Sequence, residues 1–253
     1  YIKDNYPTIQ ADLFLENFPD SYKILRGAND ARSAWTAECN GGKPYDLAFL
    51  MDTPSFERVG ANGAECIKSA KKTVNIDHHI SNPLNLCTLN LVEPEASSAS
   101  EVLYVNLNKA KISRDTASSL YLGIVHDTGA FKYSCTGKRT MQVVGDLIEV
   151  GVDFAKIVNE TYYTRTYKQT LITGYAMQQC KLGLGGKVVY SYITPEDMER
   201  FGVTPVELST VIDTIREVGG TEVALLLYPV NGKYKISLRS NYFVDVNAIA
   251  KEF

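Results

Sequence analysis

The chain of 253 residues holds three histidines, all of them in short runs that contain an aspartate. His78 and His79 directly follow Asp77, and the third histidine directly precedes Asp127. Asp52 and Asp127 share a further feature, because each is followed by a threonine. Imidazole nitrogens and carboxylate oxygens are the usual ligands of divalent transition metals. These residue types therefore indicate a candidate metal site.

Such a site suits the hydrolysis of phosphate esters. A phosphodiester is anionic and repels hydroxide, whereas two metal ions roughly 3.5–4 Å apart lower the pKa of a bridging water and clamp the phosphate oxygens. Carboxylates with a neutral imidazole favour Mn²⁺, and Mg²⁺ less, because Mg²⁺ prefers oxygen ligands. A second histidine beside the ligand can donate a proton to the phosphate or to the leaving oxygen. We therefore expect two Mn²⁺ ions, with Mg²⁺ or Co²⁺ as alternatives.

The acidic residues stand at the ends of predicted elements. Each follows one of three segments: a strand at 45–51, a strand at 73–76 and a helix at 114–125. Strands that alternate with helices predict an α/β fold with a doubly wound, mainly parallel sheet, which carries its site at the carboxyl ends of the strands. We expect Asp52, Asp77 and Asp127 to converge there. Taken singly, Asp52 can equally form a turn, and Asp127 can equally end a helix before Gly129.

The remaining pattern predicts two domains. The first is expected over 1–163, with a short strand at 11–15 and further helices at 63–72, 95–109, 137–151 and 153–163. A connecting helix is expected over 164–181. The second domain, over 182–253, is predicted as a smaller α+β domain with a glycine-rich turn at 182–186, a strand at 188–193, a helix from Pro195, a hairpin of strands at 222–228 and 233–239, and a helix at 245–253.

Composition narrows the class of partner. Net charge is −3, 45% of the residues are hydrophobic and 22% are charged, as in an ordinary soluble protein. The missing basic stripe argues against long duplex nucleic acid as a partner. Five scattered cysteines predict free thiols in a reducing cytoplasm, and no apolar run predicts a membrane span.

Four segments together resemble the DHH family of phosphoesterases: MDTPSFERVG at 51–60, NIDHHISN at 75–82, YLGIVHDTGAFKYSCT at 121–136 and SLRS at 237–240. The last resembles the arginine-bearing strand of the DHHA1 substrate domain. The order and spacing match over nearly the whole chain, and the likeness is greatest to the small bacterial nanoRNase and pAp-phosphatase group. The resemblance implies a metal-dependent phosphoesterase that cleaves short oligonucleotides, pAp or both, by attack of a hydroxide that bridges the metals.

The resemblance also implies roles for single residues. Asp52, His78 and Asp127 match metal ligands, Asp77 matches a residue that orients the site, and His79 matches an imidazole beside the phosphate. In the second domain, Arg239 and Ser240 match substrate-binding residues. A guanidinium suits a terminal phosphate because its planar fork donates two hydrogen bonds, although a strand arginine can also be merely solvated. The oligomeric state stays open, a homodimer included.

The chain departs from the family pattern in three places. The family has an early His-x-x-x-Asp-x-Asp motif and a late Gly-Gly-Gly-His loop, and neither stands in the printed sequence. We therefore do not expect this polypeptide to be active alone. At His126 the family more often has a small or hydroxyl residue, and we expect a neighbour of the site rather than an extra ligand.

Two other functions fit the same residues. A phosphodiesterase for cyclic-di-AMP or pApA would keep the fold and change the substrate. A nucleotide-binding module without catalysis would follow from true loss of the first motif. A family II pyrophosphatase fits less well, because the SLRS strand matches DHHA1.

Overall fold

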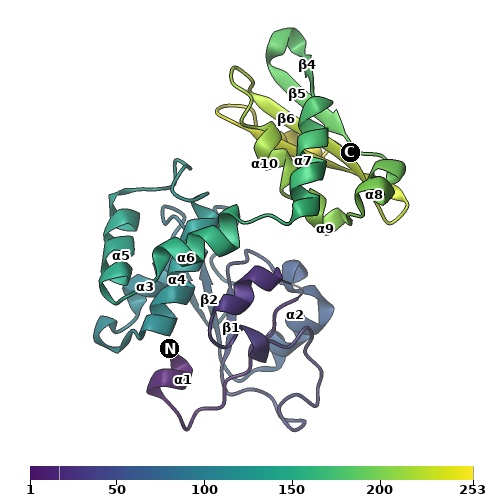
Figure 1. Ribbon diagram of the computed structural model, residues 1–253. Coiled ribbons are helices and arrows are strands. Elements are labelled where there is room, and N and C mark those ends of the chain that lie inside the picture. Colours follow the sequence, from purple (N-terminus) through teal and green to yellow (C-terminus); the bar gives the residue numbers. More distant parts are fainter. Residues whose placement is uncertain (17, 253) are drawn as a thin grey trace. The chain divides into compact units, whose positions relative to one another are not determined.

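The structure is a computed structural model that describes residues 1–16 and 18–252. The chain forms two compact units, Tyr1–Thr164 and Arg165–Phe253 (Figure 1). Each unit has its own sheet and its own hydrophobic core.

A parallel sheet of three strands organises the first unit. Its strands are β1 (Ala48–Met51), β2 (Thr73–Asp77) and β3 (Leu89–Val92), in the order β1-β2-β3. Both pairs are parallel, with Met51 opposite Ile76 and Asp77 opposite Val92. The chain segments that follow β1 and β2 therefore leave the sheet at the same edge.

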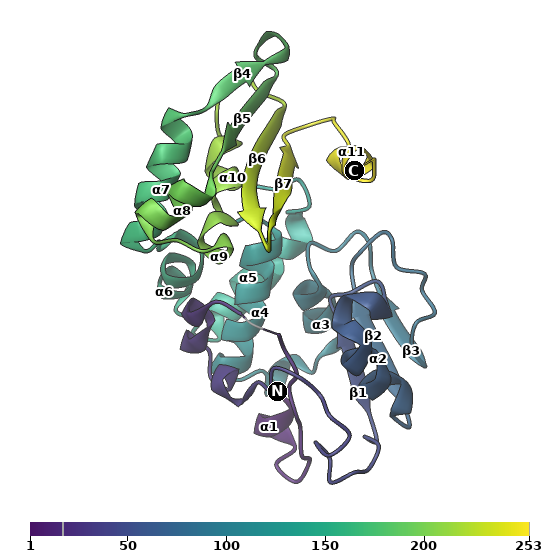
Figure 2. The same ribbon diagram turned by 90° about the vertical axis from the view of Figure 1, so that its right-hand side faces the viewer.

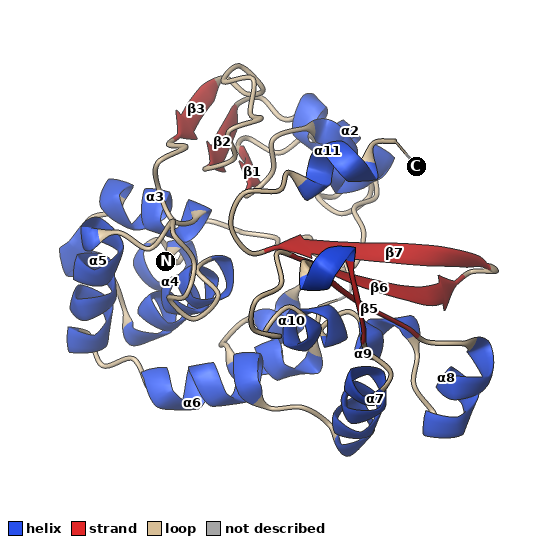
Figure 3. Cartoon of the chain, turned by 90° about the horizontal axis from the view of Figure 1, so that it is seen from above, coloured by secondary structure: helices blue, strands red, loops and turns tan. Residues whose placement is uncertain are grey.

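Helices cover both faces of this sheet, which confirms the predicted α/β class with a doubly wound sheet. They include α2 (Gly60–Ser69) and α3 (Ala99–Asn106), which lie on opposite sides of the strands (Figures 2 and 3). Leu50 packs with Ile67 of α2, whereas Ile76 packs with Val102 of α3. Side chains alternate between the two faces along a strand, so residues in both registers are buried.

The other helices of the first unit form a second layer of packing. They are α1 (Ile2–Asn5), α4 (Arg114–Asp127), α5 (Lys138–Glu149) and α6 (Phe154–Val158). Ser98 caps α3 and Ser113 caps α4, each by accepting a hydrogen bond from a backbone amide of the first turn. The fully buried Ile124 and Leu147 join α4 to α5. This packing fixes the direction in which the end of α4 points.

In the first unit, one strand prediction was wrong and one strand was missed. Residues 11–15 form only one isolated bridge, from Phe14 to Arg32. Leu13 and Leu15 are each about half exposed, so no apolar face is buried that would hold a longer strand. Conversely, β3 was not predicted, because only two leucines and a valine distinguish it from the loop before it.

The second unit is built on a mixed sheet of four strands. They are β4 (Lys181–Gly183), β5 (Val188–Tyr192), β6 (Val223–Val230) and β7 (Lys233–Ser240), in that order, and only the β5–β6 pair is parallel. The predicted antiparallel hairpin is confirmed as β6–β7.

Helices pack on the sheet of the second unit (Figure 3). The helices α7 (Tyr167–Gln178), α9 (Pro205–Leu208) and α10 (Val211–Ile215) contact its strands, whereas α8 (Pro195–Phe201) packs against α7 and α11 (Val246–Ala250) follows β7. Ile172 and Ala176 of α7, which we expected to connect the domains, are fully buried in this core. None of the helices in the described residues combines the length and apolarity needed to cross a bilayer.

Candidate metal centre

Residues from three elements of the first unit meet at the edge where β1 and β2 end. Asp52 follows β1, His78 and His79 follow β2, and Asp127 is the last residue of α4. His78 Nε2 lies 3.5 Å from Asp52 Oδ1 and 3.5 Å from Asp127 Oδ2. One candidate ligand atom each from Asp52, His78 and His79 lies within 4.8 Å of the others. The structure thus brings together two carboxylates and two imidazoles.

The His78 ring is oriented by a backbone carbonyl. Its Nδ1 lies 3.2 Å from the carbonyl oxygen of Ala96, and because a carbonyl only accepts, Nδ1 carries the hydrogen. Nε2 is then the atom that faces Asp52 and Asp127. The hydrogen bond with Asp52 raises the pKa of His78, against the opposing effect of burial. A proton and a metal ion therefore compete for the same nitrogen.

Asp77 is fully buried and holds both histidines. Its Oδ1 accepts hydrogen bonds from His79 Nδ1 at 2.6 Å and from the His78 amide at 2.8 Å. Its Oδ2 accepts from Asn82 Nδ2 at 2.6 Å. Burial raises the pKa of this carboxyl, but the hydrogen bonds from Asn82 and His79 outweigh it and the net shift is downward. Asp77 thus stays charged, and His79 Nε2 is left available.

Asp127 carries the largest electrostatic cost of the cluster. Burial, together with the nearby charge of Asp52, raises its pKa to about 6. A divalent cation placed between the two carboxylates would remove that cost, and their oxygens with His78 Nε2 form a donor set that suits such an ion. The residues present therefore fit a divalent metal ion.

Backbone geometry at both carboxylates is specialised. Asp52 has φ of 53°, a left-handed conformation that residues other than glycine adopt at a cost. After Asp127 the chain reverses through Gly129, where an added Cβ would lie 2.4 Å from the Tyr133 ring. The fully buried Thr128 fixes this reversal, because its hydroxyl donates to the Ile124 carbonyl and accepts from the Phe131 amide.

His126 faces a different environment from the residues of the metal centre. Tyr22 Oη lies 3.1 Å from its Nδ1, and the rings of Tyr22 and Tyr162 lie 5.1 and 5.5 Å from its ring. Burial lowers the pKa of His126, which favours the neutral ring. Within the described residues, the group that could hold a metal includes Asp52, His78 and His79 but not His126.

The predicted substrate residues belong to the second unit. Arg239 and Ser240 end β7. Arg239 Nε lies 3.3 Å from Asp213 Oδ1, and Ser240 donates its hydroxyl to Glu222 Oε1 over 3.0 Å. The Arg239 side chain keeps 44% of its surface exposed, so it remains open to an anionic ligand.

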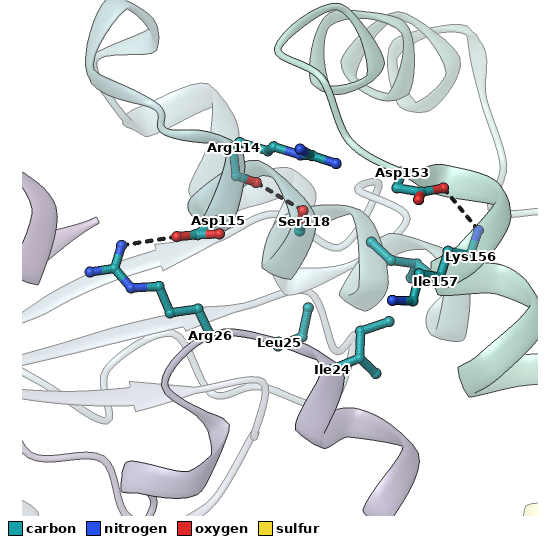
Figure 4. Close-up of a pocket in the computed structure, with 9 residues that line it drawn as sticks. All are labelled: Ile24, Leu25, Arg26, Arg114, Asp115, Ser118, Asp153, Lys156 and Ile157. Carbon is teal, nitrogen blue, oxygen red and sulfur yellow. Dashed lines mark hydrogen bonds and ion pairs between the residues drawn. The ribbon is translucent and has the colours of Figure 1, made fainter.

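A separate cavity of about 240 Å³ lies at the start of α4 (Figure 4). Its lining consists of Ile24, Leu25, Arg26, Arg114, Asp115, Ser118, Asp153, Lys156 and Ile157. Figure 4 shows Arg26 turned toward Asp115, with Nη1 2.9 Å from Oδ2, so part of its charge is compensated within the wall. The cavity lies at the opposite end of α4 from Asp127, and we assign no ligand to it.

Sequence reasoning passed over two residues that contact this site. Asn75 is fully buried and Asn82 is 6% exposed, and both side chains lie in the hydrogen-bond network of Asp77. A signal was present, because Asn75 precedes Asp77 by two positions and such residues share one face of a strand.

Comparisons with known proteins agree with the geometry. Residues 2–124 match the DHH family, N-terminal domain. The chain is 27% identical over 251 residues to the probable bifunctional oligoribonuclease and PAP phosphatase NrnA of Streptococcus mutans, covering 95% of this chain and 77% of that protein. It is 26% identical to the bifunctional oligoribonuclease and PAP phosphatase NrnA of Bacillus subtilis, covering 82% of this chain and 66% of that one.

A solved structure shows the same fold. The crystal structure of an exopolyphosphatase-related protein from Bacteroides fragilis superposes with a TM-score of 0.86 at 22% identity, covering 96% of this chain and 73% of that one. The matched domain contains β1, β2 and the Asp-His-His run that begins with the last residue of β2. From this domain match and these relatives, residues 2–124 form a DHH-family N-terminal domain.

Proposed function

We propose that the intact protein hydrolyses phosphate esters of short oligoribonucleotides and of pAp with divalent metal ions, preferably Mn²⁺. One observation carries the proposal. At one edge of the sheet, His78 Nε2 lies 3.5 Å from a carboxylate oxygen of Asp52 and 3.5 Å from one of Asp127. The names of the streptococcal and Bacillus relatives supply the substrate class.

The chain's own residues have distinct tasks in this proposal. When bound, divalent ions shield the phosphate charge and lower the pKa of water. Asp52 and Asp127 supply oxygen ligands, and His78 supplies Nε2 because the Ala96 carbonyl holds Nδ1. Asp77 accepts from His79 Nδ1 and leaves Nε2 for the substrate phosphate, where the ring, when Nε2 is also protonated, donates a hydrogen bond or that proton.

In the second unit, Arg239 is the proposed reader of a terminal phosphate. Its guanidinium offers a planar pair of donors, and Asp213 orients it from one side through Nε. Ser240 lies next to it with its hydroxyl fixed by Glu222. A residue that recognises an end phosphate favours short substrates over internal positions of long strands.

Turnover by the intact protein in Mn²⁺ tests the proposal directly. The substrates are pAp, pApA, cyclic-di-AMP and oligoribonucleotides of increasing length. We expect the highest kcat/KM on pAp and the shortest oligomers, and a drop of at least about 100-fold in Asp127→Asn with the fold retained by circular dichroism. Preference for cyclic-di-AMP, or full activity in that variant, would contradict the proposal.

A further inference from the structure

Two buried asparagines link the strand ends that carry the candidate metal ligands. Asn75 lies on β2 with no exposed surface, and Asn82 lies in the loop after β2 with 6% exposed. A buried amide without partners costs free energy, so the partners of these side chains reveal what they stabilise.

The Asn75 amide bridges the chain around Asp52. Its Nδ2 donates to the carbonyl of Leu50 at 3.2 Å and to the carbonyl of Thr53 at 3.4 Å. These carbonyls flank Asp52, whose φ of 53° is unfavourable for a residue with a side chain. The backbone ladder between β1 and β2 ends at the Asp52 amide, so the contact of Asn75 with Thr53 extends the link past the sheet.

The other end of Asn75 connects to the histidines. Its Oδ1 accepts from Asn82 Nδ2 at 2.8 Å, and the same amide nitrogen donates to Asp77 Oδ2 at 2.6 Å. Asn82 is itself fixed, because its Oδ1 accepts from the Leu84 amide at 2.9 Å. Asp77 then holds His79 through Oδ1. A continuous path of hydrogen bonds therefore runs from the turn at Asp52 to the His79 ring.

We propose that Asn75 is a positioning residue, which acts through Asn82 and Asp77 to set the distance between Asp52 and the two histidines. The inference rests on the proposed metal centre and adds a residue that never touches the metal or the substrate. Only an amide satisfies both ends of the path, since it donates to two carbonyls on one side and accepts from Asn82 on the other. A hydrophobic residue of similar size fills the space and breaks both links.

The test compares Asn75→Leu with Asn90→Leu in the intact protein. Asn90 is the matched control, because it lies opposite Asn75 on β3 and its side chain hydrogen bonds with the backbone of Cys87, away from the Asp77 network. Mn²⁺ affinity is measured by electron paramagnetic resonance of free Mn²⁺, and the unfolding midpoint is measured on the same samples. We expect Asn75→Leu to weaken Mn²⁺ binding about 10-fold or more, and Asn90→Leu to leave it unchanged.

A double variant tests the path itself. If Asn75 acts through Asn82, the loss of Mn²⁺ affinity in the pair of Asn75→Leu and Asn82→Ala should be no larger than the greater single loss. Asn82→Ala, in a loop, also serves as the milder variant should Asn75→Leu not fold. For Asn75→Leu, steady-state kinetics should show a lower kcat than in the wild type, with little change in KM for the nucleotide.

The Asp127→Asn variant distinguishes failure of the proposed metal centre from failure of the positioning role of Asn75. If Asp127→Asn keeps wild-type Mn²⁺ affinity, the metal centre itself is misplaced. If Asp127→Asn loses Mn²⁺ affinity while folded Asn75→Leu and Asn82→Ala keep it, the positioning role of Asn75 is overturned and the proposed function stands. The same conclusion follows if Asn90→Leu loses as much Mn²⁺ affinity as Asn75→Leu.

Discussion

In each unit an almost fully buried carboxylate collects several hydrogen bonds, and the two that we compare, Asp77 and Glu222, serve different purposes. Asp77 in the first unit is 0% exposed and Glu222 in the second is 5% exposed. Asp77 accepts from the His79 ring, the amides of residues 78 and 79, and Asn82. Glu222 Oε1 accepts from the Ser240 hydroxyl and from the amides of residues 242, 243 and 244.

The partners explain the difference. The negative charge of Asp77 acts on an imidazole, whose proton position and ring orientation matter for chemistry. The charge of Glu222 acts on backbone amides and one hydroxyl, and so it fixes the segment that follows β7. A buried carboxylate is therefore not by itself a sign of a catalytic site, and the groups that bond to it decide what its loss should change.

The largest expected effect is on metal binding in Asp77→Asn. The amide cannot accept from His79 with the strength of a carboxylate, so the ring loses its orientation. We expect Mn²⁺ affinity to fall roughly 10- to 100-fold, with Mn²⁺ titration as the measurement. If a folded Asp77→Asn protein kept wild-type Mn²⁺ affinity, Asp77 would have no role in metal binding and would not differ from Glu222 in purpose.

Glu101 tests whether the role of a buried carboxylate depends on the unit in which it lies or on the groups that hydrogen bond to it. It lies in the first unit, 1% exposed, but its oxygens accept from Ser97, Thr140 and Arg139, which serve structure. Glu101→Gln should lower the free energy of unfolding by about 1–3 kcal/mol, measured in urea, and leave Mn²⁺ affinity unchanged. A loss of Mn²⁺ binding would show that the whole first unit, not the set of partners, transmits the effect.

The same carboxyl predicts a pH dependence. Burial raises the pKa of Glu101, but the hydrogen bonds from Ser97, Arg139 and Thr140 outweigh it and the net shift is downward. The folded pKa therefore lies below the unfolded value, so this stabilisation is present at neutral pH and is lost as the pH falls through the folded value. The free energy of unfolding, measured against pH, should fall less steeply on acidification in Glu101→Gln than in the wild type. Parallel curves would argue against this account.

The smallest effect is expected from Glu222→Gln, because glutamine keeps one acceptor oxygen. Weaker bonds to that oxygen should loosen the segment after β7. Hydrogen exchange should speed up at the amides of Tyr242, Phe243 and Val244, while Mn²⁺ affinity stays constant. Unchanged exchange at all three amides would show that other contacts hold the segment.

The sequence alone determined the α/β class and most of the elements that carry the site. The segments before Asp52 and Asp77 were predicted as buried strands, and α4 was predicted as a helix. Both predictions rest on the spacing of apolar residues within one short segment, which the sequence shows directly. The Asp-His-His run indicated a metal site from residue chemistry alone. Each of these features depends on neighbours within a few positions.

The fold class predicted that Asp52, Asp77 and Asp127 converge, and only the tertiary structure decided the individual contacts between distant groups. It placed Asp127 against His78, turned His126 toward Tyr22 and Tyr162, and left residues 11–15 without a sheet. It also joined Asn75 to the turn at Asp52 through carbonyls of another strand. Such contacts depend on how separate segments cross in space, and local periodicity carries no information about that crossing.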